Sequence, residues 1–253
     1  MGFAYKQWVG PFFPAGMAPS NFLSHYSQLF DAVEIDSTFY GPPSTRTVKR
    51  WHAVTPSDFV FCLKTPRTIT HDLRLIGATE PMMAFLDSAR RLEAKLGVVL
   101  IQLPPDFSHD AFLPLMRFLE VLPSDIRFAI EFRNRSWNSP GTTTLLERHN
   151  ICFTSADYNY MPKSVLRTAD FLYLRFLGPR GRYPSKDREF DDRAAEMTQW
   201  QSRIQPHLKD VGHSFVFFNN DFTGYAPAAC SRFRKLLGID ERNEQPWRQQ
   251  RLL

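Results

Sequence analysis

Short apolar runs alternate with longer segments of helical periodicity along most of this chain. That alternation is typical of βα units and favours a parallel sheet covered by helices. The run at residues 98–103 is nearly all apolar, as expected of a strand buried on both faces. The clearest helix is predicted at residues 79–96, where Thr79 and Pro81 mark its start and Gly97 is expected to close it. We therefore predict an α/β fold.

The number of apolar runs favours a TIM-type (β/α)8 barrel. We predict strands at residues 32–36, 59–64, 98–103, 127–131, 151–155, 171–176 and 214–219. We predict helices at residues 20–30, 44–54, 79–96, 110–122, 142–149, 191–208 and 225–237. A closed barrel of this kind has eight strands, and only Met1 to Phe3 precede the first loop. The first strand is therefore expected to be truncated or to begin upstream, and a doubly wound open sheet is the alternative fold.

The length of 253 residues suits one barrel, and no repeat or internal linker divides the chain. We expect a single domain at residues 1–238, followed by a basic tail at 239–253. The net charge of +5 favours anionic partners without identifying them. The three cysteines are widely spaced, which argues against a disulfide framework. No apolar stretch approaches the length of a membrane span and no secretory signal is recognised, so a cytoplasmic location is expected.

Charged or amide residues follow nearly every predicted strand. They are Glu34, Asp36, Lys64, Gln102, Glu131, Arg133, Asp157, Arg175, Asn219, Asn220 and Asp221. The C-terminal ends of barrel strands meet on one face, where active sites are built. We therefore predict a functional pocket there. In the alternative interpretation the charges are structural, and pairs such as Glu131 with Arg175, or Glu34 with Lys64, neutralise each other.

The residue types at this face suggest distinct roles. Carboxylates and a loop histidine can transfer protons if their pKa values suit the reaction, whereas guanidinium and ammonium groups bind phosphate or carboxylate. The candidate catalytic residues are Glu34, Glu131, Asp157 and His71. The candidate substrate-binding residues are Lys64, Arg67, Arg133, Arg175, Asn219, Tyr40 and Trp137. The aromatic residues can either stack a sugar or base, or simply cover the barrel mouth.

No motif identifies a cofactor. The chain lacks the glycine-rich fingerprints of nucleotide sites, the serine-hydrolase elbow and the usual histidine spacings of zinc enzymes. A divalent metal stays open, because Glu, Asp and His all occur at the predicted face. His71 is a candidate metal ligand, although a loop histidine beside Asp72 can equally serve to order its loop.

Three functional interpretations follow. The first is an enzyme acting on an anionic, phosphate-bearing small molecule or on nucleic acid. The second is a carbohydrate isomerase or hydrolase that uses aromatic residues for stacking and carboxylates for proton transfer. The third is a binding or scaffold barrel without catalysis, in which the charged strand ends pair internally. The oligomeric state is left open.

Several loops together resemble the YecE-like family, domain of unknown function family 72. The matching segments are 5–14 (YKQWVGPFFP), 33–40 (VEIDSTFY), 64–75 (KTPRTITHDLRL), 102–107 (QLPPDF), 129–137 (AIEFRNRSW), 173–178 (YLRFLG) and 217–226 (FFNNDFTGYA). The resemblance spans the chain to about residue 238 and implies a TIM-type barrel, but it carries no established activity. The family pattern commonly has histidine at two positions occupied here by Asn134 and Leu177. A function that depends on those histidines would be altered in this chain.

Overall fold

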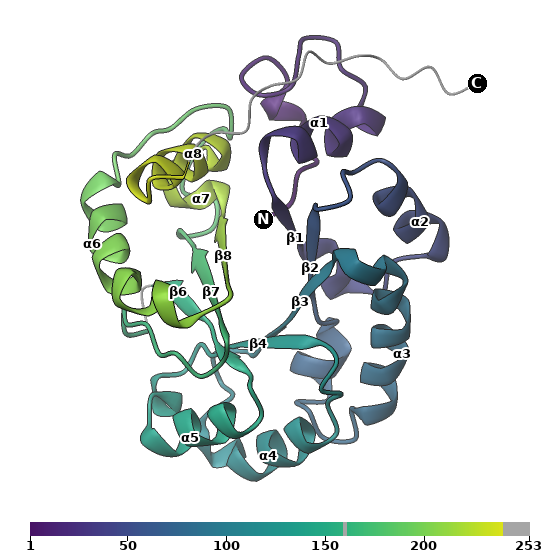
Figure 1. Ribbon diagram of the computed structural model, residues 1–253, viewed down its shortest axis with the longest axis vertical. Coiled ribbons are helices and arrows are strands. Elements are labelled where there is room, and N and C mark those ends of the chain that lie inside the picture. Colours follow the sequence, from purple (N-terminus) through teal and green to yellow (C-terminus); the bar gives the residue numbers. More distant parts are fainter. Residues whose placement is uncertain (159–160, 240–253) are drawn as a thin grey trace.

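The computed structural model describes residues 1–158 and 161–239, and it places the strands at the centre with helices around them (Figure 1). The strands are β1 (Ala32–Ile35), β2 (Val60–Lys64), β3 (Leu96–Gln102), β4 (Arg127–Glu131), β5 (Cys152–Phe153), β6 (Ser155–Asp157), β7 (Phe171–Phe176) and β8 (His213–Phe218). The α-helices are α1 (Phe22–Leu29), α2 (Thr45–Ala53), α3 (Thr79–Ala89), α4 (Phe112–Glu120), α5 (Pro140–Arg148), α6 (Ala194–Ile204), α7 (Asn220–Thr223) and α8 (Ala226–Leu236). The predicted α/β alternation is confirmed. Most of the predicted basic tail, residues 240–253, lies outside the described residues.

Every strand pair is parallel, but the ladders form two sheets rather than one closed ring. One sheet has the order β1-β2-β3-β4-β5 and the other β6-β7-β8. Only Thr154 separates β5 from β6, and its N–H donates to the Ile130 carbonyl at 2.8 Å. At the other junction, the Gly2 N–H donates to the Glu34 carbonyl at 2.8 Å. The Met1 amino group donates to the Phe218 carbonyl at 2.9 Å. The N-terminal segment therefore lies between β1 and β8, although it forms no strand of its own.

Alternate strand residues belong to two separate apolar clusters, as the two-residue period of a strand requires. The larger cluster joins one set of strand side chains to the surrounding helices. The smaller, central cluster includes Cys62, Val98, Leu100, Ala129, Cys152, Ala156, Phe171, Tyr173 and Phe217. Lys64, Glu131 and Arg175 each follow one of its members by two positions. Their side chains therefore lie on the same side of the strands, at the C-terminal ends.

The segment predicted as one long helix at 79–96 divides in two. Helix α3 ends at Ala89, and Glu93 in the next helical turn has a φ of 52°. Gly97 does not close the helix, because it lies inside β3. A Cβ atom there would come within 2.3 Å of Val60 Cγ1 on β2. The prediction was wrong because this glycine serves close strand packing and not a helix end.

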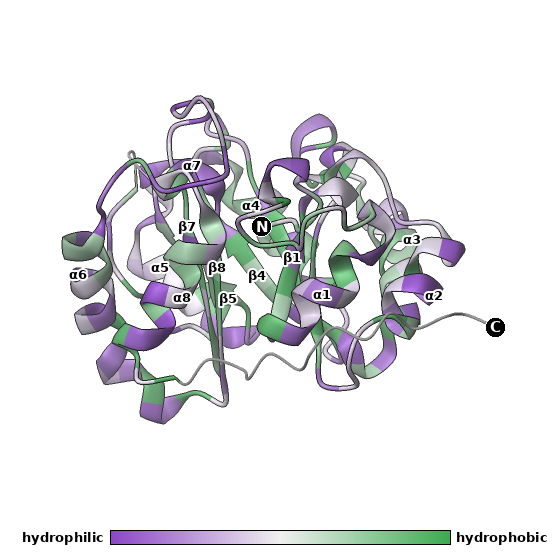
Figure 2. Ribbon diagram, turned by 90° about the horizontal axis from the view of Figure 1, so that it is seen from above, coloured by the Kyte–Doolittle hydropathy of each residue, from purple (hydrophilic) through white to green (hydrophobic). Residues whose placement is uncertain are grey.

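Figure 2 shows the hydropathy that underlies this arrangement, with apolar strands in the interior and hydrophilic segments on the outer helices and loops. Two serines begin outer helices as caps. The Ser44 hydroxyl accepts from the Thr47 N–H ahead of α2, and Ser139 accepts from Thr142 in the first turn of α5. Throughout residues 1–158 and 161–239, each helix is too short or too polar to cross a membrane.

Candidate functional site

Arg175 joins the two sheets through a buried ion triad, by which we mean Arg175, Glu34 and Glu131. Arg175 Nη2 donates to Glu34 Oε1 at 2.7 Å, and Nη1 donates to Glu131 Oε2. The three side chains are 3%, 0% and 1% exposed, respectively. The predicted pairing of Glu131 with Arg175 is confirmed, and Glu34 pairs with Arg175 rather than with Lys64. Because one guanidinium serves two carboxylates from different strands, the triad fixes the mutual position of β1, β4 and β7.

The two carboxyl groups of the triad have opposite pKa shifts. Burial by itself would raise the pKa of Glu131, but attraction by Arg175 and Arg133 outweighs it and lowers this pKa to about 2. Arg133 Nε donates to Glu131 Oε1 at 2.6 Å. Burial raises the pKa of Glu34 and Asp36 raises it further, and together they outweigh the attraction of Arg175, which Glu34 shares with Glu131. Glu131 therefore stays ionised, whereas Glu34 is the carboxyl group that takes up a proton more readily.

Tyr173 completes the surroundings of Glu34, and it was not among the predicted site residues. Its hydroxyl donates to Glu34 Oε2 at 2.6 Å, so both oxygens of Glu34 have partners. Tyr173 precedes Arg175 by two positions in β7, and both side chains point to the same side. The two-residue strand period was the signal that could have identified it.

Lys64 and His71 both lie near the aromatic ring of Phe39. Lys64 Nζ is 4.2 Å from the centroid of Phe39, and the His71 ring centroid is 5.0 Å from it. His71 also shares a hydrogen bond of 2.8 Å between Nδ1 and the Thr70 hydroxyl. Burial lowers the pKa of Lys64, and repulsion by Arg175 lowers it further. The predicted residues Lys64 and His71 are therefore brought together at the strand ends.

Burial and nearby cations both lower the pKa of His71. Its pKa is lowered by burial and then by Lys64, Arg67 and Arg133, against the opposing effect of Asp72. Burial is the largest cause of this lowering, and the three cations add to it against Asp72. Chemically, the arrangement offers a neutral imidazole next to fixed positive charge. We call Lys64, Arg67, His71 and Arg133 the cationic mouth.

The two arginines of the cationic mouth differ in exposure. Arg133 is 21% exposed, and its guanidinium carbon is 4.5 Å from the centroid of the Tyr158 ring. Arg67 is exposed, and its Nε lies 3.1 Å from Asp72 Oδ1. An exposed pair of this kind is weak and easily exchanged for a ligand. Arg133 is instead fixed by its hydrogen bond to the buried Glu131.

Asp157 does not join Glu34 and Glu131, contrary to the prediction. It accepts from Trp200 Nε1 of α6 at 2.8 Å and from Lys163 Nζ at 3.2 Å. Its neighbour Ala156 belongs to the central cluster, so Asp157 points to the opposite side, toward the helices. The sequence shows that Asp157 ends a strand. Because it directly follows a member of the central cluster, and does not lie two positions after one, its side chain points away from the site.

Of three other predicted binding residues, Trp137 and Asn219 have structural contacts and Tyr40 is exposed to solvent. Trp137 is fully buried, stacks on Phe132 and donates from Nε1 to the Phe107 carbonyl, so the prediction that it binds substrate at the mouth was wrong. Asn219 accepts from the Asp221 N–H at 2.9 Å and caps α7. Tyr40 is 84% exposed and has the Phe39 ring as an aromatic neighbour. Within residues 1–158 and 161–239, Tyr40 and Trp137 form no shared stacking surface, because Trp137 is buried.

The two positions that depart from the family pattern have ordinary structural roles. Asn134 accepts from the Ser136 N–H at 3.1 Å and donates to the Pro105 carbonyl at 2.9 Å. Leu177 is buried in the central cluster. Among the described residues, no group of three or more His, Cys, Asp or Glu side chains has the arrangement of a metal site.

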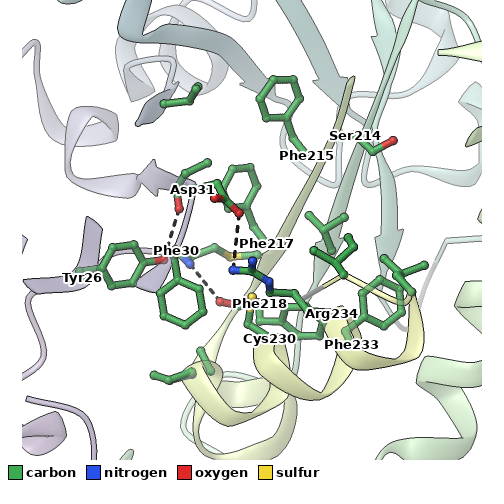
Figure 3. Close-up of a pocket in the computed structure, with 18 of the residues that line it drawn as sticks. Tyr26, Phe30, Asp31, Ser214, Phe215, Phe217, Phe218, Cys230, Phe233 and Arg234 are labelled. Carbon is green, nitrogen blue, oxygen red and sulfur yellow. Dashed lines mark hydrogen bonds and ion pairs between the residues drawn. The ribbon is translucent and has the colours of Figure 1, made fainter. Parts of the chain in front are cut away.

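A cavity of about 300 Å³ lies elsewhere, between α1, α8 and the junction of β1 with β8 (Figure 3). The first residues of β1, β2 and β8 contribute to its lining, so it extends toward the strand starts. Phe30, Phe217 and Phe233 make it largely apolar, and the pair of Arg234 with Asp31, 3.5 Å apart, borders it. This cavity is distinct from the cationic mouth at the strand ends.

Known proteins resemble this chain in both sequence and fold. UPF0759 protein YunF of Bacillus subtilis is 29% identical, and the match covers 90% of each protein. UPF0759 protein YecE of Escherichia coli K12 is 32% identical over 119 residues, which span 47% of this chain and 44% of YecE.

A crystal structure of a DUF72 family protein from Thermotoga maritima has a TM-score of 0.81 and 30% identity, covering 94% of this chain and 96% of that one. A DUF72 family protein from Enterococcus faecalis shares the fold, with a TM-score of 0.74 and 23% identity over 87% of this chain and 95% of that one. The family described as "Protein of unknown function DUF72" matches residues 1–251. The chain therefore belongs to the DUF72 family, as the YecE-like motifs indicated.

Proposed function

We propose that this protein is an enzyme that binds a phosphate-bearing small molecule in the cationic mouth, at the C-terminal ends of its strands. The observation that carries the proposal is the placement of Lys64 and His71 against the same Phe39 ring, at 4.2 Å and 5.0 Å from its centroid. Burial lowers the pKa of His71, and Lys64, Arg67 and Arg133 lower it further, against the opposing effect of Asp72. Arg67 and Arg133 each have a carboxylate partner, whereas within the described residues no carboxylate oxygen lies within 4.0 Å of Lys64 Nζ, and such a cation favours an anion. Guanidinium groups match the geometry of phosphate oxygens in particular.

We also propose that the two sheets together make one TIM-type barrel, with residues 1–3 in the place of the first strand. The Gly2 and Met1 hydrogen bonds to β1 and β8 support this, as does the single residue between β5 and β6. The central cluster supports it as well, because strands of both sheets contribute to it. In such a barrel the cationic mouth lies on the face where TIM-barrel active sites are built.

His71 is the best candidate for proton transfer. It lies in the mouth, and its lowered pKa leaves the imidazole neutral and able to accept a proton at pH 7. Glu34 and Glu131 have almost no exposed surface and act as positioning residues, because they orient Arg175 and Arg133. The proposed roles are therefore anion binding by Arg133 with Lys64 and Arg67, proton transfer by His71, and support by the buried ion triad.

Two features favour a small molecule over a polymer or a sugar. Arg133 is recessed at the strand ends and is held by Glu131, whereas a nucleic-acid surface uses exposed cations along a groove. Trp137, one of the aromatic residues expected to stack on a carbohydrate, is fully buried. The scaffold alternative is favoured by the internal pairing of the triad and of Arg133 with Glu131, but it does not account for the positive charge of Lys64.

A thermal-shift screen tests the proposal, because a ligand that binds only the folded state raises the melting temperature. The probes are inorganic phosphate, pyrophosphate, sugar phosphates, nucleotides, short oligonucleotides and neutral sugars. We expect phosphate compounds to stabilise the parent protein and the Arg127→Gln variant, because Arg127 is exposed at the opposite end of β4. Arg133→Gln should abolish the shift. Stabilisation by neutral sugars alone, or no shift with any probe, would contradict the proposal.

A further inference from the structure

Lys64 is the one member of the cationic mouth that carries a primary amine, which becomes a nucleophile for carbonyl carbon when it loses its proton. Guanidinium groups do not deprotonate in proteins, so Arg67 and Arg133 can only bind charge. A lysine amine can also attack carbonyl carbon, provided that it is neutral. Lys64 follows Cys62 of the central cluster by two positions and is therefore directed to the interior side of β2, at its C-terminal end.

The contacts of Lys64 are those of an amine without a strong partner. Among the described residues no carboxylate oxygen lies within 4.0 Å of its Nζ, which instead faces the Phe39 ring. Lys95 makes a useful comparison, because its Nζ donates to the His52 carbonyl at 2.7 Å and the Thr55 carbonyl at 2.8 Å. Lys163 likewise pairs with Asp157. Lys64 thus contacts the Phe39 ring, while Asp36, Glu131 and Glu34 attract its amine from beyond ion-pair distance.

From this geometry we propose that Lys64 forms an imine with a phosphorylated aldehyde or ketone bound in the cationic mouth. This inference rests on the proposed function, because Arg133 is needed to hold the phosphate. Burial and Arg175 lower the pKa of Lys64 and outweigh the opposing attraction of Asp36, Glu131 and Glu34, which increases the fraction of neutral amine at pH 7. His71 lies beside the same Phe39 ring and is placed to move protons during the reaction.

The step balances without any other reactant. The amine lone pair of Lys64 attacks the carbonyl carbon, and the carbonyl oxygen takes up a proton to give a carbinolamine. The nitrogen then loses its extra proton, and the hydroxyl group leaves as water after a second protonation. A C=N bond replaces the C=O bond, and hydrolysis reverses the sequence. No oxidation or reduction occurs, and His71 can give and receive the protons.

Reductive trapping tests this inference on the full chain. Dihydroxyacetone phosphate is incubated with the protein, sodium borohydride reduces any imine to a stable secondary amine, and peptide mass mapping identifies the labelled lysine. We expect a single adduct at Lys64, no labelling of Lys95, and protection by inorganic phosphate. Unphosphorylated dihydroxyacetone should label Lys64 at least about tenfold more slowly, because it lacks the charge-assisted hydrogen bonds of the phosphate. The Lys64→Arg variant, which keeps the positive charge, should give no adduct.

Phosphate binding is measured by thermal shift in the same preparations, so that the two proposals fail separately. If phosphate stabilises the protein but borohydride labels Lys64 no more than the other lysines, the imine inference is wrong and the proposed function stands. If phosphate does not bind and no adduct forms, both are wrong. Equal labelling by the phosphorylated and unphosphorylated ketones would also overturn the inference, because the anion would then have no part in the reaction.

Discussion

Replacing Arg175 by methionine should destabilise the protein strongly. Methionine keeps an unbranched chain of similar length but removes the guanidinium that lies between Glu34 and Glu131. Glu131 then retains only Arg133, and Glu34 retains only the Tyr173 hydroxyl. Removing one partner from a buried ion pair costs about 3–5 kcal/mol. For a chain of this size the loss corresponds to a fall in the melting temperature of roughly 6–20 °C.

Denaturant unfolding at several pH values measures the effect. Without Arg175 the pKa values of both glutamates rise, so the variant gains relative stability as the pH falls and the carboxyl groups become neutral. The difference in unfolding free energy between parent and variant should therefore shrink from pH 8 to pH 5. Arg67→Met is the matched control, because its exposed pair with Asp72 contributes only about 0–1 kcal/mol. A loss below about 1 kcal/mol for Arg175→Met, or a loss that is the same at both pH values, would refute the reasoning.

Three further predictions concern stability. The pKa of Glu131 is lowered from 4.5 to about 2, so its contribution to the free energy of unfolding is present above pH 4.5 and is lost as the pH falls toward 2. Over this range the unfolding free energy of the parent should fall by on the order of 3 kcal/mol more than that of Glu131→Gln. Asp157→Asn should cost about 1–3 kcal/mol in denaturant unfolding yet leave phosphate binding intact, because Asp157 faces α6; loss of binding at unchanged stability would place it in the site. Gly97→Ala should cost about 1–3 kcal/mol through its contact with Val60, whereas Gly141→Ala in α5, with no atom within 4 Å of the added Cβ, should not destabilise; equal melting temperatures for the two variants would contradict the packing argument.

Hydrophobic periodicity was sufficient to predict most elements of this fold. The strand at Phe171–Phe176 and the strand at Arg127–Glu131 were predicted with their observed bounds. The periodicity failed where a local contact decided the structure. Gly97 resembles a helix end in sequence, and only the approach of Val60 from another strand shows that it belongs to β3.

The candidate site was predictable to the extent that position along a strand determines the direction of a side chain. Glu34, Lys64, Glu131 and Arg175 all lie at strand ends on the side of the central cluster, and the structure brings them together. Asp157 falls on the other side of its strand, next to Ala156 of the central cluster, so its side chain points toward α6. The sequence also could not separate an aromatic residue at the mouth from one in the core, because the burial of Trp137 depends on Phe107 and Phe132.

The central claim, that positive charge prevails at the cationic mouth and attracts an anion, is tested most directly by the pKa of His71. NMR titration of its imidazole, assigned with a His71→Asn variant, measures this pKa with and without phosphate. The account predicts a pKa below the ordinary value of 6.5 in the free protein, because burial and the three neighbouring cations disfavour the charged ring. Phosphate should raise it by neutralising those cations. A pKa at or above 6.5 that phosphate does not change would contradict the account.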